Sequence, residues 1–285
     1  MAEICRSWQL ARECWQLPAQ GAVMGVLNVT PDSFSDGGLR TTVPAALEHA
    51  RHLVAAGADM IDIGGESTRP GAQEVSGAEE LRRVVPVIQA IRAEFPALRL
   101  SIDTRHAEVA RAALQAGADV VNDISGLASP AMRDVCAEFP CGVVLMHMQG
   151  EPGTMQQNPQ YTDVVAELRA FFEERVQLVL DAGIALNRIC LDPGIGFGKT
   201  TAHNLALIAG LESLRVRNLP ILMALSRKRF LGELVGDAEM ARTTPLPTVT
   251  MSLLAAERGA DLHRVHDVAE LCAALRLRTA LSAAE

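Results

Sequence analysis

Short apolar segments alternate along the chain with longer segments in which apolar residues recur every three or four positions. The short segments are typical of buried strands and the longer ones of amphipathic helices. Eight strands are predicted in this way: Val23–Leu27, Met60–Ile63, Leu98–Ile102, Val120–Val121, Val143–Met146, Ile189–Leu191, Ile221–Ala224 and Leu262–Val265. Helical patterns lie between them, among them Pro44–Ala56, Ala78–Glu94, Ala107–Ala116, Tyr161–Ala182 and Val249–Arg258. This alternation predicts βαβ units and therefore a parallel sheet.

One pattern recurs where a helix passes into a strand. The segments AAGADMIDIGG, QAGADVVNDISG and ERGADLHRVHDV share it, and DAGIALNRICLDPG is a looser version. In each segment we expect the glycine to end a helix, because glycine adopts positive φ at little cost. The apolar residues that follow it then form the strand.

Eight such units in 285 residues favour an α/β fold of one domain, a closed (β/α)8 barrel. A doubly wound sheet is the alternative, but no G-x-G-x-x-G follows the first predicted strand. We predict that residues 21–285 form the barrel. Residues 1–20 are predicted to be a short N-terminal extension, in which SWQLARECWQL forms a hairpin that closes the bottom of the barrel.

Composition and charge narrow the class of partner. The net charge of −8 argues against nucleic acid, which requires a basic surface. No apolar run is long enough to cross a bilayer. The six cysteines form no C-x-x-C pair and are predicted to be reduced thiols. We expect a cytoplasmic protein that binds neither nucleic acid nor membrane; the charge does not exclude a small anionic substrate.

Polar or charged residues follow every predicted strand, and in a (β/α)8 barrel these strand ends carry the chemistry. They include Asn28, the segment from Gly64 to Gly71, Asp103, Asn122, Asp123, His147, Asp192, the segment Ser226-Arg227-Lys228, Arg264 and His266. One such residue is more often a helix cap or a turn. Eight groups on one rim, however, predict an active site.

Arg264 and His266 are two positions apart on one strand and therefore point the same way. Together with Arg69 and Lys228 they would form a cationic cluster suited to a phosphate or diphosphate. On spacing alone, a solvated strand end explains the pair equally well.

The segment LDPGIGFGKT, residues 191–200, nearly spells a nucleotide-binding P-loop. That motif requires a first glycine at position 193, where this chain has Pro193, and Asp192 would repel phosphates. We interpret the segment as a glycine-rich loop shaped around Asp192 and not as an ATP site.

Taken together, the chain resembles the dihydropteroate synthase family. The resemblance is carried by GVLNVTPDSFSDGG (25–38), DIGGESTRPGA (62–72), SIDT (101–104), VVNDISG (120–126), VLMHMQG (144–150), DPGIGFGKT (192–200), SRKRFLG (226–232) and RVHDV (264–268). It implies a TIM-type barrel, usually a homodimer, and a sulfonamide target. It also implies a transferase that joins 6-hydroxymethyl-7,8-dihydropterin diphosphate to 4-aminobenzoate and releases diphosphate.

The resemblance also implies the roles of individual residues. The pterin would lie among Asp103, Asn122, Asp192 and Lys228, with Met146 and Phe197 on its ring faces, although ordinary packing is an equal alternative for these two. The diphosphate would meet Asn28, Thr68, Arg69, Arg264 and His266, and Asn28 would also contact Mg²⁺. The 4-aminobenzoate would lie near Phe34, Thr68, Arg69 and Pro70, with its carboxylate at Ser226, where we expect a helix to begin.

The implied mechanism is dissociative. The diphosphate leaves first, and Asp103 and Asp36 stabilise the pterin-methyl cation that the amine then attacks. The residues expected to act in catalysis are Asp36, Asp103, Lys228, Arg264 and His266. No protein nucleophile is expected.

Two segments depart from the family pattern: Ala224 stands where glycine is frequent, and TTPLPTVT (243–250) replaces a Gly-Ser pair. Neither departure removes an expected catalytic group, and sulfonamide sensitivity stays open. Two alternatives to the synthase remain. One is a pterin-binding methyltransferase, which has no need of a diphosphate site. The other is a catalytically silent pterin-binding paralogue.

Overall fold

The computed structural model describes residues 6–30, 43–66, 74–150 and 153–284. The strands, in chain order, are β1 (Ser7–Gln9), β2 (Cys14–Gln16), β3 (Ala22–Asn28), β4 (Met60–Gly64), β5 (Arg99–Asp103), β6 (Val120–Asp123), β7 (Gly142–Met146), β8 (Ile189–Asp192), β9 (Leu222–Met223) and β10 (Leu262–Val265). The helices are α1 (Val43–Ala56), α2 (Gly77–Glu94), α3 (Ala107–Gln115), α4 (Pro130–Glu138), α5 (Val164–Asp181), α6 (Thr201–Ala209), α7 (Arg229–Val235), α8 (Ala238–Thr243), α9 (Leu246–Glu257) and α10 (Val268–Ser282).

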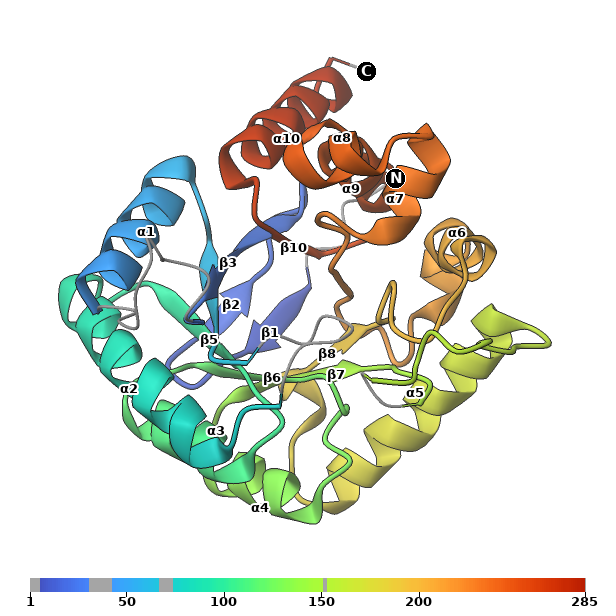
Figure 1. Cartoon of the computed structure of the whole chain (residues 1–285). Helices are drawn as coiled ribbons and strands as arrows, with labels where there is room; N and C mark the ends of the chain where they lie inside the picture. The colour runs from blue at the N-terminus through green and yellow to red at the C-terminus, as the bar shows by residue number, and fades with distance from the viewer. Residues whose placement is uncertain (1–5, 31–42, 67–73, 151–152, 285) are drawn as a thin grey trace.

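Strands β3 to β10 form one parallel sheet, in the order β8-β7-β6-β5-β4-β3-β10-β9. A parallel bridge between Leu191 and Ile221 joins β8 to β9, and the Leu191 amide donates to the Pro220 carbonyl at 2.9 Å. This contact closes the ring, and the helices surround it (Figure 1). The predicted (β/α)8 barrel is therefore confirmed, and each predicted strand agrees with an observed one to within one or two residues.

The Gly-Ala-Asp repeat has one structural role at three places. Each of its glycines ends a helix with positive φ: 100° at Gly57, 110° at Gly117 and 96° at Gly259. The aspartate two positions later accepts a hydrogen bond from a backbone amide at the start of the neighbouring strand. These bonds are Val23 N to Asp59, Leu100 N to Asp119 and Ile221 N to Asp261, at 2.8–2.9 Å. The repeat therefore pins adjacent strands at the bottom of the barrel.

The predicted helix Tyr161–Ala182 begins three residues later than expected. The carboxylate of Asp163 accepts from the amides of Val165 and Ala166, both at 3.0 Å, and so caps the helix at that point. A side chain that satisfies the first free amides of a helix fixes its start.

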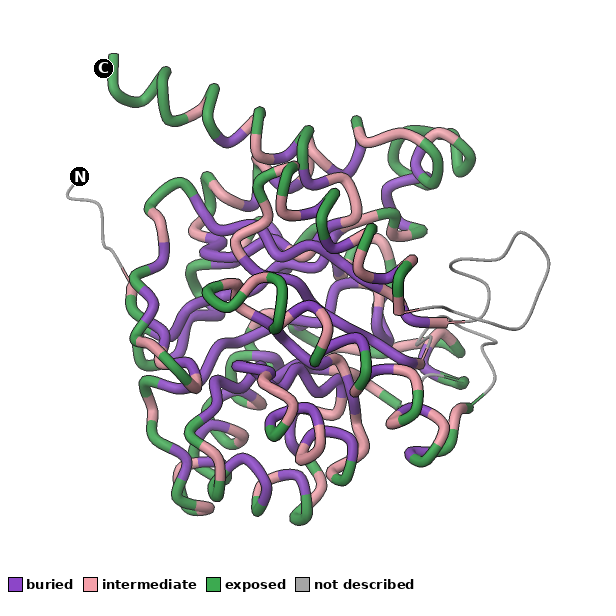
Figure 2. Tube along the Cα trace, turned by 90° about the vertical axis from the view of Figure 1, so that its left-hand side faces the viewer, coloured by how far each residue is buried: buried purple, intermediate pink, exposed green. Residues whose placement is uncertain are grey.

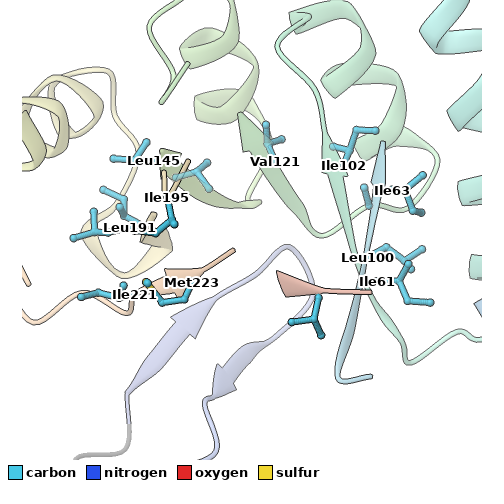
Figure 3. Packing of buried hydrophobic residues seen from close by; sticks show 14 of the residues in the cluster. Ile61, Ile63, Leu100, Ile102, Val121, Leu145, Leu191, Ile195, Ile221 and Met223 are labelled. Atoms are coloured by element: carbon cyan, nitrogen blue, oxygen red, sulfur yellow. The ribbon is translucent and has the colours of Figure 1, made fainter. Parts of the chain in front are cut away.

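Residues along each barrel strand alternate between two environments. Ile61, Ile63, Leu100 and Ile102 face outward and pack against the surrounding helices (Figure 3). The residues between them face the barrel interior, since successive strand side chains point to opposite faces. In the tube of Figure 2, the buried residues are concentrated in the centre of the molecule.

The lower interior of the barrel is apolar and is covered by a hairpin. Strands β1 and β2 pair antiparallel, with Trp8 opposite Trp15. Both tryptophans pack in one cluster with inward residues near the strand starts, including Met60, Val120 and Leu262. The Trp8 indole also donates to the Arg188 carbonyl at 2.8 Å. The hairpin and this layer seal the lower end, so polar inward residues gather at the upper end.

His263 of β10 lies on the outer face of its strand and is completely buried. Neither ring nitrogen has a hydrogen-bond partner among the described residues, and burial lowers the pKa of His263 to about 3. The unfolded chain therefore binds one more proton than the folded protein between pH 3 and about pH 6.5, and folding stability decreases as the pH falls through this window.

We expect the acid sensitivity of the fold to decrease in a His263→Leu variant. Between pH 7.5 and pH 5.0, the wild-type free energy of unfolding should fall by about 2 kcal/mol more than that of the variant, because each pH unit below 6.5 contributes about 1.4 kcal/mol. Urea unfolding of both proteins at the two pH values measures this difference. Equal losses of unfolding free energy in the two proteins would show that His263 is not a source of the acid sensitivity.

Candidate active site

A cavity of about 1160 Å³ lies at the C-terminal ends of the barrel strands. Every described residue to which the family resemblance gives a role lines it: Asn28, Asp103, Asn122, Met146, Asp192, Phe197, Ser226, Lys228, Arg264 and His266. Five others, Phe34, Asp36, Thr68, Arg69 and Pro70, lie outside the described residues. Segments separated by more than 200 positions in the sequence thus meet at one cavity.

Arg264 is held between two carboxylates. Its Nε donates to Oδ2 of Asp62 at 2.5 Å, and its Nη2 donates to Oδ2 of Asp103 at 2.7 Å. Burial raises the pKa of Asp103; Arg264 opposes this rise, whereas Asp62 adds to it. One cation is thus shared by two acidic groups, and the site has an excess of negative charge on this side.

Asn122 and Asp123 are neighbours on β6 with opposite orientations. The Asn122 side chain lines the cavity and its Nδ2 donates to Oδ2 of Asp62 at 3.1 Å. Asp123 points away and accepts bonds from Ser125 and from the Leu127 amide at 2.8–3.1 Å. Asp123 therefore shapes a turn and does not line the cavity.

Asp192 lies at the end of β8 and is buried. It accepts a hydrogen bond from the Gly194 amide at 2.7 Å. Burial raises the pKa of Asp192, while this bond and the nearby cations Lys228, Arg264 and Lys199 lower it. Asp192 is thus an acidic acceptor with several cations around it, suited to pairing with ligand N–H groups.

The cavity also has an apolar wall. Ile124, Met146, Met155 and Phe197 form a separate buried cluster. The Lys228 ammonium lies 4.2 Å from the centre of the Phe197 ring, within the range of a cation–π contact. A flat ring system can pack against this wall while its polar edge meets Asp192 and Asn122.

Lys199, the lysine of the P-loop-like segment, is buried and turned inward. Its Nζ lies 2.9–3.3 Å from the carbonyl oxygens of Gly194, Phe197 and His147, and 3.0 Å from His147 Nδ1. A P-loop lysine instead extends to the phosphates. Burial lowers the pKa of Lys199 to about 7, and burial with the adjacent Lys199 lowers that of His147 to about 3. Lys199 therefore fastens the loop and is not placed to bind a nucleotide.

The same loop requires glycine at position 194. Gly194 has φ +63°, and a Cβ there would lie 1.9 Å from the His147 carbonyl oxygen. The close approach of these two segments brings Phe197 to the cavity wall.

We expect Lys199→Met to lower the free energy of unfolding by about 2 kcal/mol, because three carbonyl groups and a ring nitrogen lose their buried donor. Affinity for the pterin that the family resemblance implies should fall in parallel, since the loop carries Phe197 and the Gly194 amide. Urea unfolding and calorimetry measure the two effects. Unchanged stability together with loss of ATP binding would instead support the P-loop interpretation.

Ser226 does not stand at a helix start, contrary to the prediction. Helix α7 begins at Arg229 and has Lys228 as its N-cap. Arg227 has φ +58°, a left-handed conformation that a helix does not contain, and its amide donates to Thr248 Oγ1 at 3.1 Å. The Ser226 hydroxyl instead lies 2.9 Å from His266 Nδ1.

Thr248 belongs to the segment 243–250 that departs from the family pattern, and it is fully buried. Through its bond to Arg227 it supports the loop that carries Ser226 and Lys228. The other departure, Ala224, lines the cavity. Both departures therefore lie at the site or directly behind it, and neither removes an expected catalytic group.

The oxygens of Asn28 and Asp103 converge beside Gly64, because the three residues are in register on β3, β4 and β5. A Cβ at Gly64 would lie 3.8 Å from Asn28 Oδ1 and 3.8 Å from Asp103 Oδ2. The glycine thus leaves space between two oxygen acceptors. Within residues 6–284, leaving out the undescribed segments, no group of three or more His, Cys, Asp or Glu side chains could hold a metal.

Comparison with known proteins decides the family. The pterin-binding enzyme family matches residues 24–266. Dihydropteroate synthase of Escherichia coli is 47% identical over 264 residues, which cover 92% of this chain and 93% of that protein. This chain belongs to the dihydropteroate synthase family. It is accordingly a transferase.

Solved dihydropteroate synthases have the same fold. One from Xanthomonas albilineans with 4-aminobenzoic acid is 48% identical, with a TM-score of 0.89 over 98% of this chain and 99% of that one. Another from the same organism, in complex with 7,8-dihydropteroate, is 46% identical, with a TM-score of 0.87 over 97% and 99% of the two chains.

Among the residues that line or support this site, the roles of Asp62, Lys199 and Thr248 were not predicted. Asp62 could have been found, because it is an inward position of β4 by simple alternation. The roles of Lys199 and Thr248 depend on loop conformation, which no periodic pattern encodes. Conversely, Asp123 and His147 follow predicted strands but do not line the cavity.

Proposed function

We propose that the protein condenses (7,8-dihydropterin-6-yl)methyl diphosphate with 4-aminobenzoate to give 7,8-dihydropteroate and diphosphate in folate biosynthesis. The observation that carries this proposal is the convergence of the described polar strand ends on one cavity, where acidic and amide groups lie beside an apolar wall and cations. The solved relatives hold 4-aminobenzoic acid and 7,8-dihydropteroate, which are a substrate and the product of this reaction.

The pterin binds at the inner part of the cavity. Asp192 accepts two ring N–H groups, Asn122 pairs with the adjacent edge, and Lys228 donates to the ring carbonyl or a ring nitrogen. Met146 and Phe197 cover the ring faces. Because Asp192 and Asn122 are buried, bulk water competes weakly for these bonds.

The diphosphate lies toward Arg264, His266 and Asn28, with Thr68 and Arg69 completing its surroundings. Nε of Arg264 donates to Asp62 and one N–H of Nη2 donates to Asp103, so Nη1 and the second N–H of Nη2 can meet the phosphate oxygens. As the C–O bond breaks, its electron pair leaves with the diphosphate. A cation positioned for that charge stabilises the transition state more than the ground state.

Mg²⁺ fits this site through Asn28 Oδ1, beside the space that Gly64 leaves open. Magnesium retains several waters and is usually bound by one or two protein oxygens together with substrate phosphates. When bound, it would neutralise charge on the departing diphosphate.

Loss of diphosphate leaves a cation on the pterin methylene group. The Asp103 carboxylate, together with Asp36, stabilises that cation. The amine lone pair of 4-aminobenzoate then forms the new C–N bond, and the amine releases a proton. The 4-aminobenzoate lies toward Phe34, Thr68, Arg69 and Pro70, with its carboxylate near the Ser226 hydroxyl.

The test is a single assay of product and leaving group. The purified protein is incubated with the pterin diphosphate, with and without 4-aminobenzoate, and with Mg²⁺ or EDTA. We expect equal amounts of 7,8-dihydropteroate and diphosphate, and a loss of activity in EDTA that added Mg²⁺ restores. Pterin binding without diphosphate release under any condition would instead support a silent paralogue, and methyl transfer from methyltetrahydrofolate would support a methyltransferase.

We also propose that the protein is a homodimer in the cytoplasm. Leu246 of α9 and Leu277 and Leu281 of α10 are more than half exposed, and the two helices pack side by side. An exposed apolar surface of this kind favours association. Analytical ultracentrifugation at several protein concentrations measures the monomer–dimer equilibrium.

No helix of the described residues is long and apolar enough to span a membrane.

A further inference from the structure

Asp62 lies one layer behind the cavity. It faces the barrel interior on β4, is completely buried, and does not line the cavity itself. Its Oδ2 accepts from both Asn122 Nδ2 and Arg264 Nε, at 3.1 and 2.5 Å. One buried oxygen thus joins a residue of the pterin side to a residue of the diphosphate side.

We propose that Asp62 is a positioning residue that fixes the orientation of Asn122 and Arg264 before the substrate binds. This inference rests on the function proposed above and adds a residue that acts on the reaction only through two others. A carboxylate paired with a guanidinium only accepts hydrogen bonds, and so it dictates which atoms of its neighbours turn toward it.

For Asn122 the consequence is a defined amide orientation. The NH2 group must face Asp62, because its carbonyl oxygen would meet another acceptor there. Asn122 Oδ1 is therefore turned away from Asp62 and is available to the ligand. The ligand edge at that position must supply an N–H donor, and a ring with an acceptor there would be rejected, because two acceptors would then face one another.

For Arg264 the consequence is a fixed guanidinium plane. Asp62 and Asp103 bind its Nε and Nη2 from two neighbouring strands, β4 and β5. Within the described residues, Nη1 makes no hydrogen bond, and Arg264 borders the cavity. Asp62 thereby holds Arg264 in place, so that little reorganisation is required when the leaving group develops charge.

The first experiment compares Asp62→Asn with the wild type. This substitution keeps the shape and an oxygen that can accept both bonds, but it removes the negative charge that pairs with Arg264 and places an NH2 group where Oδ1 has no hydrogen-bond partner. We expect the affinity for 6-hydroxymethylpterin, measured by calorimetry, to fall roughly 10- to 100-fold, the range seen when outer-shell partners of metal ligands are removed. The KM for 4-aminobenzoate should change less than twofold, because Asp62 contacts only groups on the pterin and diphosphate side. If the variant does not fold, Asp62→Ser is measured in its place, with the same expectation.

The second experiment exchanges the two side chains. Asn122→Asp alone places two carboxylates at the 3.1 Å contact and should lose more pterin affinity than Asp62→Asn. The double variant Asp62→Asn with Asn122→Asp restores an amide–carboxylate bond in the reverse direction. We expect the double variant to bind the pterin at least tenfold more tightly than Asn122→Asp does. If the losses of pterin affinity in the two single variants simply add in the double variant, the proposal is overturned.

Asp59→Asn is the matched control. Asp59 lies just before the same strand at its opposite end and accepts from the Val23 amide, far from the cavity. This variant should lose stability without a change in pterin affinity. If Asp62→Asn behaves in the same way, Asp62 is a structural residue and the proposal is wrong. Failure of the proposed function would look different, because the wild-type protein itself would then release no diphosphate.

Discussion

Replacing Asp192 with alanine is expected to abolish useful pterin binding. The carboxylate is buried and close to the cations Lys228, Arg264 and Lys199, so its removal leaves positive charge without its partner and the ligand N–H groups without an acceptor. Truncation of one member of a buried charge pair costs about 2–5 kcal/mol, which corresponds to a loss of roughly 30- to 5000-fold in affinity. Calorimetry with 6-hydroxymethylpterin measures it.

The control for this prediction is Asp192→Asn. An asparagine oxygen can still accept the bond from the Gly194 amide, so the glycine-rich loop keeps its anchor. The asparagine has lost the charge and the second acceptor, and we therefore expect most of the affinity to be lost in this variant as well. Lys228→Ala should show a comparable loss, with the fold retained in each case. Pterin affinity close to that of the wild type in Asp192→Ala would refute the assignment of the pterin site.

Arg264→Ala is expected to slow diphosphate release about 100- to 1000-fold, the range found when one group that stabilises developing negative charge is removed. The guanidinium also neutralises Asp62 and Asp103, so the variant leaves two carboxylates facing each other inside the barrel. Pre-steady-state measurement of diphosphate release reports the rate of bond breaking. Thermal unfolding of the same variant reports how much of the loss comes from stability.

Arg264→Lys is the informative comparison. A lysine keeps the positive charge but cannot bind two carboxylates side by side with one rigid plane. Compared with Arg264→Ala, we expect Arg264→Lys to regain more of the lost stability than of the lost rate of diphosphate release. A normal rate of diphosphate release in Arg264→Ala would remove this residue from the leaving-group site.

The barrel and much of its site could be predicted because strand side chains alternate with a period of two. That rule, applied from the last residue of each strand, places Asn28, Asn122 and Asp192 on the inner face and Asp123 on the outer face. The Gly-Ala-Asp repeat likewise marks the strand starts, because its aspartates bind the amides of neighbouring strands.

The features that escaped prediction depend on contacts between loops. The left-handed Arg227 separates Ser226 from helix α7, and the residue that supports it, Thr248, lies 21 positions away. Lys199 turns inward because four acceptors surround it, and three of them become neighbours only through the glycine-rich turn and the close approach of His147. Asp62 differs from these, because it lies in the middle of β4 and the alternation along that strand marks it as an inward residue.

The most direct measurement is a crystal structure of this protein with 6-hydroxymethylpterin, Mg²⁺ and diphosphate. We expect the pterin ring to lie against Met146 and Phe197. Its polar edge should bond to Asp192, Asn122 and Lys228, and its hydroxymethyl group should point toward Arg264 and Asn28. A pterin bound outside this cavity, or one that touches neither Asp192 nor Lys228, would contradict the site and the reaction proposed for it.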